Sequence, residues 1–131
     1  MLVGAARQAV DMAAKDDLGR AGEERAVQHL IGLGYEILDR NWRCAQGEID
    51  IVGRLGRHLA IVEVKTRSSS RFGHAFEAVD ARKLGRLWQL AFAWSAEHRD
   101  EARGRILRVE VVAVTGPDPR AAEIEHLVDV A

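Results

Sequence analysis

The sequence predicts a single α/β domain with the element order α-β-β-β-α-β and a trailing β-strand. Apolar residues recur at helical spacing in segments 18–33 and 80–98. Runs rich in β-branched residues occupy the segments between and after these helices. A length of 131 residues suits one domain with a substantial core, and 47% hydrophobic residues exclude a disordered chain.

The first helix is expected over residues 18–33, where Ala26, Val27 and Leu30 form an apolar stripe. Glu23 lies three and four residues before this stripe, so it is expected on the inward face of the helix. The alternative is a first-turn carboxylate that only interacts favourably with the helix dipole. Residues 1–17 are expected to form a flexible extension, for which the alanines also allow a helix, ahead of a single domain that spans residues 18–131.

A strand is expected at residues 35–42, and a polar turn leads from it into a second strand over residues 48–53. Side chains alternate between the two faces of a strand. This alternation predicts one face that carries Glu48, Asp50 and Val52 and an opposite face that carries Ile49 and Ile51.

A third strand is expected over residues 58–66, and its apolar residues on both faces predict a central position in the sheet. Glu63 and Lys65 share one of its faces. A short turn with Gly56 would allow antiparallel pairing of the second and third strands. Asp50 is then expected opposite Glu63, with Lys65 one step along the strand.

A second helix is expected over about residues 80–98, with Asp80 at its N-cap. Trp88 and Trp94 lie at helical spacing, so we expect them in the core rather than stacked on nucleic-acid bases. The remaining strands are expected at residues 106–115 and, as a short edge strand, at 123–128.

The formal net charge of −1 does not indicate a nucleic-acid-binding protein, but basic residues are concentrated between residues 40 and 71. A nearly neutral protein can therefore present a basic face. The single cysteine, Cys44, excludes an intramolecular disulfide and a cysteine-based zinc site. No segment approaches the roughly 20 apolar residues of a membrane span, and the N-terminus lacks a secretory signal, so a cytoplasmic protein is expected.

Asp50, Glu63 and Lys65 are the strongest functional signal, because charges in apolar strands are costly unless they are paired or bind something. Two neighbouring carboxylates stay ionised only near positive charge, which Lys65 or a hard cation such as Mg²⁺ can supply. Such an ion can activate water and stabilise charge on a phosphodiester. Lys65 would orient the attacking water or neutralise the phosphorane, and Glu23 could complete the acidic cluster. The alternative is a solvated ion-pair network worth roughly 0–1 kcal/mol per pair.

Several short motifs follow one another in a fixed order over about residues 19–128. They are Gly19-x-x-Gly22-Glu23-x-x-Ala26, Gly34-Tyr35, Ile37-Leu38, Arg40-Asn41-Trp42-Arg43, Gly47-Glu48-Ile49-Asp50, Val62-Glu63-Val64-Lys65-Thr66-Arg67, Gly73, Glu77-Ala78-Val79 and Lys83. This order resembles the YraN family of predicted endonucleases. That family is similar to archaeal Holliday junction resolvases within the PD-(D/E)XK nuclease superfamily.

This resemblance implies a restriction-endonuclease-like sandwich, in which helices flank a mixed central sheet. It implies Asp50 and Glu63 as ligands of Mg²⁺ or Mn²⁺, Lys65 as the catalytic lysine, and Glu23 as an acid contributed by the helix. Ile49 replaces the proline of the superfamily motif, as in the YraN family. Glu110 stands where the family pattern has aspartate, so no catalytic role is expected for it.

The leading hypothesis is a metal-dependent endonuclease that hydrolyses DNA, with branched or structured DNA as its partner and a homodimer suggested by analogy. A non-catalytic nucleic-acid-binding module and an interaction protein with a structural acidic cluster are the alternatives. Glu48 is expected to support Asp50 or to lie at the rim. The five histidines show no metal-ligand spacing. Candidate phosphate contacts, each also explicable as an ordinary solvated cation, are Arg43, Arg67, Arg71, Lys83 and Arg86.

Overall fold

A computed structural model of the chain describes the backbone of residues 2–69 and 80–128 and the side chains of residues 17–69 and 80–128. The helices and strands of this part are α1 (Leu2–Gly32), β1 (Glu36–Cys44), β2 (Gly47–Leu55), β3 (His58–Arg67), α2 (Ala81–Glu97), α3 (Arg99–Ala102), β4 (Ile106–Thr115), the 3₁₀ helix η2 (Pro119–Ala121) and β5 (Glu123–Leu127). The predicted mixed α/β class and element order are confirmed. The short helices α3 and η2 were not predicted.

One open, five-stranded sheet has the strand order β1-β2-β3-β4-β5. Neighbouring strands are antiparallel except β3 and β4, which run parallel in register from His58 opposite Ile106 to Arg67 opposite Thr115. The chain passes through α2 between these two parallel strands, as parallel pairing requires a long connection. The central position predicted for β3 is confirmed.

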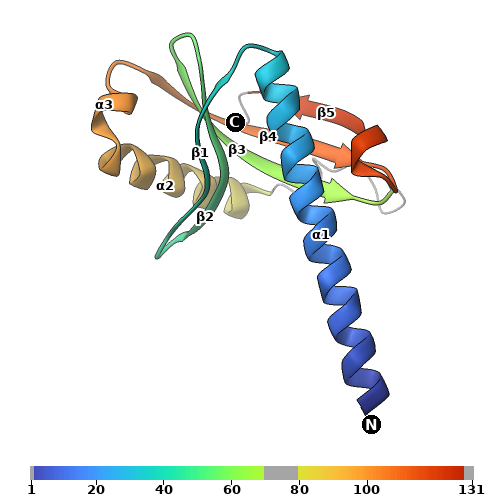
Figure 1. Ribbon diagram of the computed structural model, residues 1–131. Coiled ribbons are helices and arrows are strands. Elements are labelled where there is room, and N and C mark those ends of the chain that lie inside the picture. The colour runs from blue at the N-terminus through green and yellow to red at the C-terminus, as the bar shows by residue number, and fades with distance from the viewer. Residues whose placement is uncertain (1, 70–79, 129–131) are drawn as a thin grey trace.

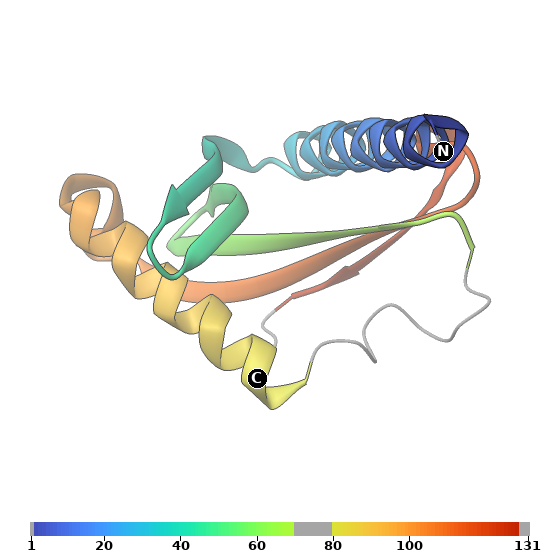
Figure 2. The same ribbon diagram turned by 90° about the horizontal axis from the view of Figure 1, so that it is seen from below.

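The sheet lies between two helices, with α1 on one face and α2 on the other (Figure 2). Apolar residues of β3 divide between these faces: Ala60 and Val62 belong to the cluster beneath α1, and Leu59 and Ile61 to the cluster beneath α2. The alternation predicted for β3 is therefore confirmed. Because the alternation continues along the strand, it directs Glu63 and Lys65 to the α2 side.

Helix α1 begins at Leu2, so the separate helix start predicted at residue 18 was wrong, while the helix that the alanines allowed in the preceding extension is present from Leu2. Its N-terminal part extends past the sheet, whereas its C-terminal part packs on it (Figure 1). The inward stripe was predicted correctly, because Ala26, Val27 and Leu30 are buried. No helix of the described residues is long and apolar enough to cross a membrane.

The faces predicted for β2 were partly wrong. Ile49 lies with Val52 in the cluster beneath α2, whereas Ile51 lies in the cluster beneath α1. The pairing between β2 and β3 stops at Ile51 and Val62, while β2 stays paired with β1 down to the hairpin turn. The free end of this hairpin bends toward α2, and this bend breaks the simple alternation (Figure 2).

Candidate functional site

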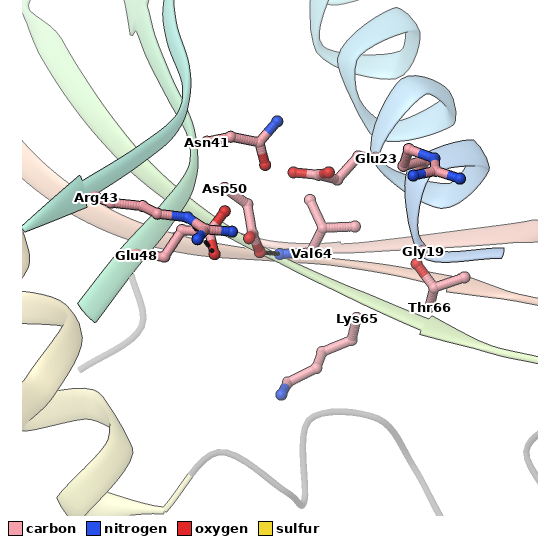
Figure 3. Close-up of a pocket in the computed structure, with 10 residues that line it drawn as sticks. Gly19, Glu23, Asn41, Arg43, Glu48, Asp50, Val64, Lys65 and Thr66 are labelled. Atoms are coloured by element: carbon pink, nitrogen blue, oxygen red, sulfur yellow. Dashed lines mark hydrogen bonds and ion pairs between the residues drawn. The ribbon is translucent and has the colours of Figure 1, made fainter. Parts of the chain in front are cut away.

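An open pocket of about 720 Å³ lies where β2 separates from β3 and both strands approach α1. Figure 3 shows Glu48 and Asp50 from β2 and Glu23 from α1 gathered on one side of β3. The pocket is lined by Gly19, Arg20, Glu23, Asn41, Arg43, Glu48, Asp50, Val64, Lys65 and Thr66. Three of the predicted acidic residues and the predicted lysine therefore contribute to one pocket.

Asp50 lies one residue beyond the last pair of the β2–β3 ladder. Its Oδ2 atom accepts a hydrogen bond of 2.8 Å from the backbone N–H of Val64. The side chain thus satisfies a donor on β3 at the point where backbone pairing with β2 has ended. Burial raises the pKa of Asp50 to about 7, and the negative charge of Glu63 contributes next, followed by Glu23 and Glu48.

Glu63 is the centre of a small charged group on the α2 side of β3. Its Oε1 atom lies 3.5 Å from Lys65 Nζ and 3.4 Å from Lys83 Nζ. Burial, assisted by contact with Lys83, lowers the pKa of Lys65, although the charge of Glu63 opposes this effect. In Figure 3 the ammonium group of Lys65 extends away from Asp50. The predicted lysine therefore contacts Glu63 directly, whereas Lys65 and Asp50 share only the lining of the pocket.

Glu23 comes to the pocket from α1, which confirms its predicted inward position. Glu24 is exposed, with a carboxylate oxygen 3.0 Å from Arg40 Nη1. Burial raises the pKa of Glu23, the charge of Arg40 lowers it, and the charge of Glu48 raises it. Glu48 lies 3.6 Å from Nε of the exposed Arg43. The pocket therefore combines an acidic interior with arginines at its rim.

The predicted phosphate contacts do not form one group. Arg43 lines the pocket, and Lys83 contacts Glu63. Arg67, at the end of β3, and Arg86, on α2, are not among the lining residues, and Arg71 lies outside the described residues. Sequence reasoning gave no role to Arg20 or Asn41 in the site. Asn41 is a named residue of the motif Arg40-Asn41-Trp42-Arg43, which was the available signal, whereas Arg20 occupies an unspecified position of its motif.

The acidic residues fit a divalent cation only with help from water. Within the described part of the chain, no three His, Cys, Asp or Glu side chains are assembled closely enough to hold a metal ion. Mg²⁺ usually retains several waters and takes one or two protein carboxylates, so a full set of protein ligands is not required. Burial and then the charges of neighbouring carboxylates raise the pKa of the partly buried Asp50, and a bound cation would offset this excess of negative charge.

Close contact between α1 and β3 places Glu23 beside the pocket. A Cβ atom on Gly22 would lie 2.0 Å from Oγ1 of Thr66, so only glycine allows this approach. We expect Gly22→Ala to lower the free energy of unfolding by about 1–3 kcal/mol, because overpacking forces the two elements apart. Thermal unfolding measures the change, with Gly19→Ala as control, since no atom lies within 4 Å of a Cβ added there. Equal unfolding temperatures for the two variants would contradict the tight contact.

A second polar cluster lies outside the pocket, between α1, β4 and β5. Glu110 is fully buried, and its Oε1 atom accepts hydrogen bonds from Tyr35 Oη at 2.9 Å and His126 Nε2 at 2.7 Å. Its Oε2 atom accepts one from Arg108 Nε at 2.7 Å. His29 on α1 contacts His126 Nδ1 at 3.1 Å. Glu110 thus links three elements of the fold, a structural role that the sequence did not indicate.

Comparison with known proteins assigns the family. The model of "Uncharacterised protein family UPF0102" matches residues 22–114. The chain belongs to the UPF0102 family. A UPF0102 protein of Arthrobacter sp. (strain FB24) is 53% identical over 116 residues, which cover 88% of this chain and 97% of that protein. A UPF0102 protein of Kineococcus radiotolerans is 46% identical over 122 residues, 93% of this chain and 99% of that protein.

Membership of UPF0102 confirms the resemblance to the YraN family. The matched segment includes the four central acidic and basic residues, Glu23, Asp50, Glu63 and Lys65. A relation of UPF0102 to nucleases and junction resolvases stays a prediction.

Proposed function

We propose that this UPF0102 protein is a metal-dependent endonuclease that hydrolyses phosphodiester bonds of DNA. The main support is the geometry at the end of the β2–β3 ladder. There burial raises the pKa of the partly buried Asp50 to about 7, and the next contribution comes from the charge of Glu63, which contacts Lys65 at 3.5 Å. Groups whose pKa values are displaced in opposite directions within one pocket are typical of catalytic sites.

Asp50 and Glu63 would hold Mg²⁺ or Mn²⁺ between them, with water completing the coordination. When bound, the ion would lower the pKa of coordinated water and offset charge on the phosphate. Lys65, with its pKa lowered, would donate a hydrogen bond to the attacking water or accept its proton. Glu63 keeps the lysine side chain in place. Glu23 and Glu48 would add negative charge around Asp50 and so favour cation binding.

Branched or structured DNA is the proposed substrate class, with a homodimer as the active form. Support comes from the resemblance to junction resolvases and from the mixed sheet between α1 and α2, which suits a restriction-endonuclease-like fold. Arg20 and Arg43 at the pocket could contact the phosphates that flank the cleaved bond. Two active sites in a dimer would allow cleavage of paired strands.

A cleavage assay with Mg²⁺ or Mn²⁺ on duplex, flap and four-way-junction DNA tests this proposal. We expect Lys65→Ala to reduce the cleavage rate about 10²-fold or more, because general acid–base groups typically contribute that amount. Arg103→Ala is the control, since this basic side chain is 79% exposed and lies outside the pocket lining. Absence of metal-dependent cleavage by the wild type, or full activity of Lys65→Ala, would contradict the proposal.

A non-catalytic nucleic-acid-binding module is the second candidate. It is favoured by the orientation of Lys65 away from Asp50 and by the absence of a three-residue metal-binding group among the described residues. For this function, DNA affinity would fall steeply with salt and would be unchanged by Asp50→Asn. Binding titrations at several salt concentrations therefore separate the two candidates.

A further inference from the structure

We infer that Asn41 is a positioning residue that holds the carboxylates of Glu23 and Glu48 in a fixed arrangement around Asp50. The role of these carboxylates in cation binding rests on the proposed function. The contacts of Asn41 with them do not depend on that function. Those contacts join α1 to the β1–β2 hairpin across the pocket.

The backbone at Asn41 is unusual. Its φ is +53°, and it is the non-glycine residue with positive φ among the residues that the structure describes. Asparagine tolerates this left-handed conformation better than most residues with a side chain. Because Arg40 pairs with Ile51 and Trp42 with Ile49, Asn41 occupies the position of β1 that faces Asp50. At this position the exposed Asn41 is one of the residues that line the pocket.

The amide of Asn41 bridges two elements. With its nitrogen turned toward the carboxylates, it donates to Glu23 Oε1 at 2.8 Å, to Glu23 Oε2 at 3.2 Å and to Glu48 Oε1 at 3.2 Å. Figure 3 shows this side chain beside Glu23, with the oxygen drawn nearer. Nitrogen and oxygen exchange places when the amide rotates by half a turn, and only the nitrogen can donate to a carboxylate.

A neutral donor suits this position. Glu23, Glu48 and Asp50 repel one another, and the charges of both glutamates raise the pKa of Asp50. A lysine or arginine in place of Asn41 would fix the glutamates but would also cancel the charge that attracts a cation. The asparagine amide supplies hydrogen bonds to charged acceptors and leaves the net charge of the pocket unchanged.

The test compares wild type with Asn41→Gly, because glycine accepts positive φ without strain and the substitution removes the side chain that carries the amide. We expect Mn²⁺ binding in titration calorimetry to weaken about tenfold, which matches the loss of one or two charge-assisted hydrogen bonds. NMR titration should also show a higher pKa for the Glu23 carboxyl group, because a donor to its charged form is lost. Gln46→Gly is the matched control, since it removes an amide from the same hairpin outside this pocket.

An Asn41→Gly protein that changes only in unfolding temperature, with wild-type Mn²⁺ affinity and Glu23 pKa, would overturn the inference. A wild type that binds no Mn²⁺ would remove the metal from the proposed function, and the Glu23 pKa would then decide the role of Asn41. A wild type that binds Mn²⁺ but cuts no DNA would leave the positioning role in place and overturn only the nuclease activity. The two proposals can therefore fail separately.

Discussion

Asp50→Asn is expected to abolish metal-dependent cleavage and to raise the unfolding temperature of the metal-free protein at pH 8 by about 5–10 °C. Burial, together with the charges of Glu63, Glu23 and Glu48, raises the pKa of Asp50 to about 7. At pH 8 the ionised side chain is therefore held at an energetic cost. Asparagine has the same shape and can still accept the hydrogen bond from Val64, but it carries no charge.

The pH dependence of this effect has a defined sign. The native pKa of about 7 exceeds the ordinary value of 3.8, so the folded protein binds more protons between these two pH values. Stability contributed by the protonated Asp50 is complete below pH 3.8 and is lost as the pH rises to about 7. The full difference corresponds to about 4 kcal/mol as an upper limit, which water in the open pocket reduces.

Thermal unfolding with a chelator at pH 4 and pH 8 measures this change. The stabilisation of Asp50→Asn relative to wild type should be large at pH 8 and small at pH 4. Added Mn²⁺ should stabilise the wild type by mass action and leave the variant unchanged. Asp100→Asn, whose side chain is 92% exposed, is the control and should match wild type throughout. A variant that still cleaves, or a pH-independent gain, would contradict the assignment of Asp50.

Glu110→Gln is expected to lower the free energy of unfolding by about 3–5 kcal/mol, because it removes one charge from a buried, hydrogen-bonded group. Glu110 accepts from Tyr35, Arg108 and His126 and is fully buried. Glutamine has one acceptor oxygen and places an amide donor against another donor. Urea unfolding at pH 7 measures the loss, and the exposed Glu101→Gln serves as control.

The free energy of unfolding of wild type and Glu110→Gln, measured as the pH is lowered, gives a second test. Burial acts to raise the pKa of Glu110, but hydrogen bonds from His126, Arg108 and Tyr35 outweigh it and hold the pKa below its ordinary value of 4.5. Its contribution to stability is therefore present above pH 4.5 and is lost as the pH falls through the native pKa. Glu110→Gln should lose less stability than wild type below pH 4.5. If the free energy of unfolding fell equally with pH below 4.5 in both proteins, a charged Glu110 in the native state would be contradicted.

Local patterns in the sequence determined much of the fold. Asp80 was predicted as the N-cap of α2, and its side chain accepts a hydrogen bond of 2.9 Å from Lys83 N. Helical spacing selected Glu23 rather than Glu24 as the inward carboxylate, and strand alternation placed Glu63 with Lys65. These features depend on residues a few positions apart, whose geometry is set by the period of a helix or strand.

Only the tertiary structure decided how these elements meet in a pocket. The end of the β2–β3 ladder at Ile51 results from the bend of the hairpin toward α2, so no strand period could predict that Ile49 and Val52 pack together. The contacts of Asn41 with Glu23 and of Glu110 with His126 join separate elements of the chain. The sequence by itself thus determined the element order and the central charged residues. Packing between distant segments determined their environment, because burial and neighbouring charge arise only when those segments come together.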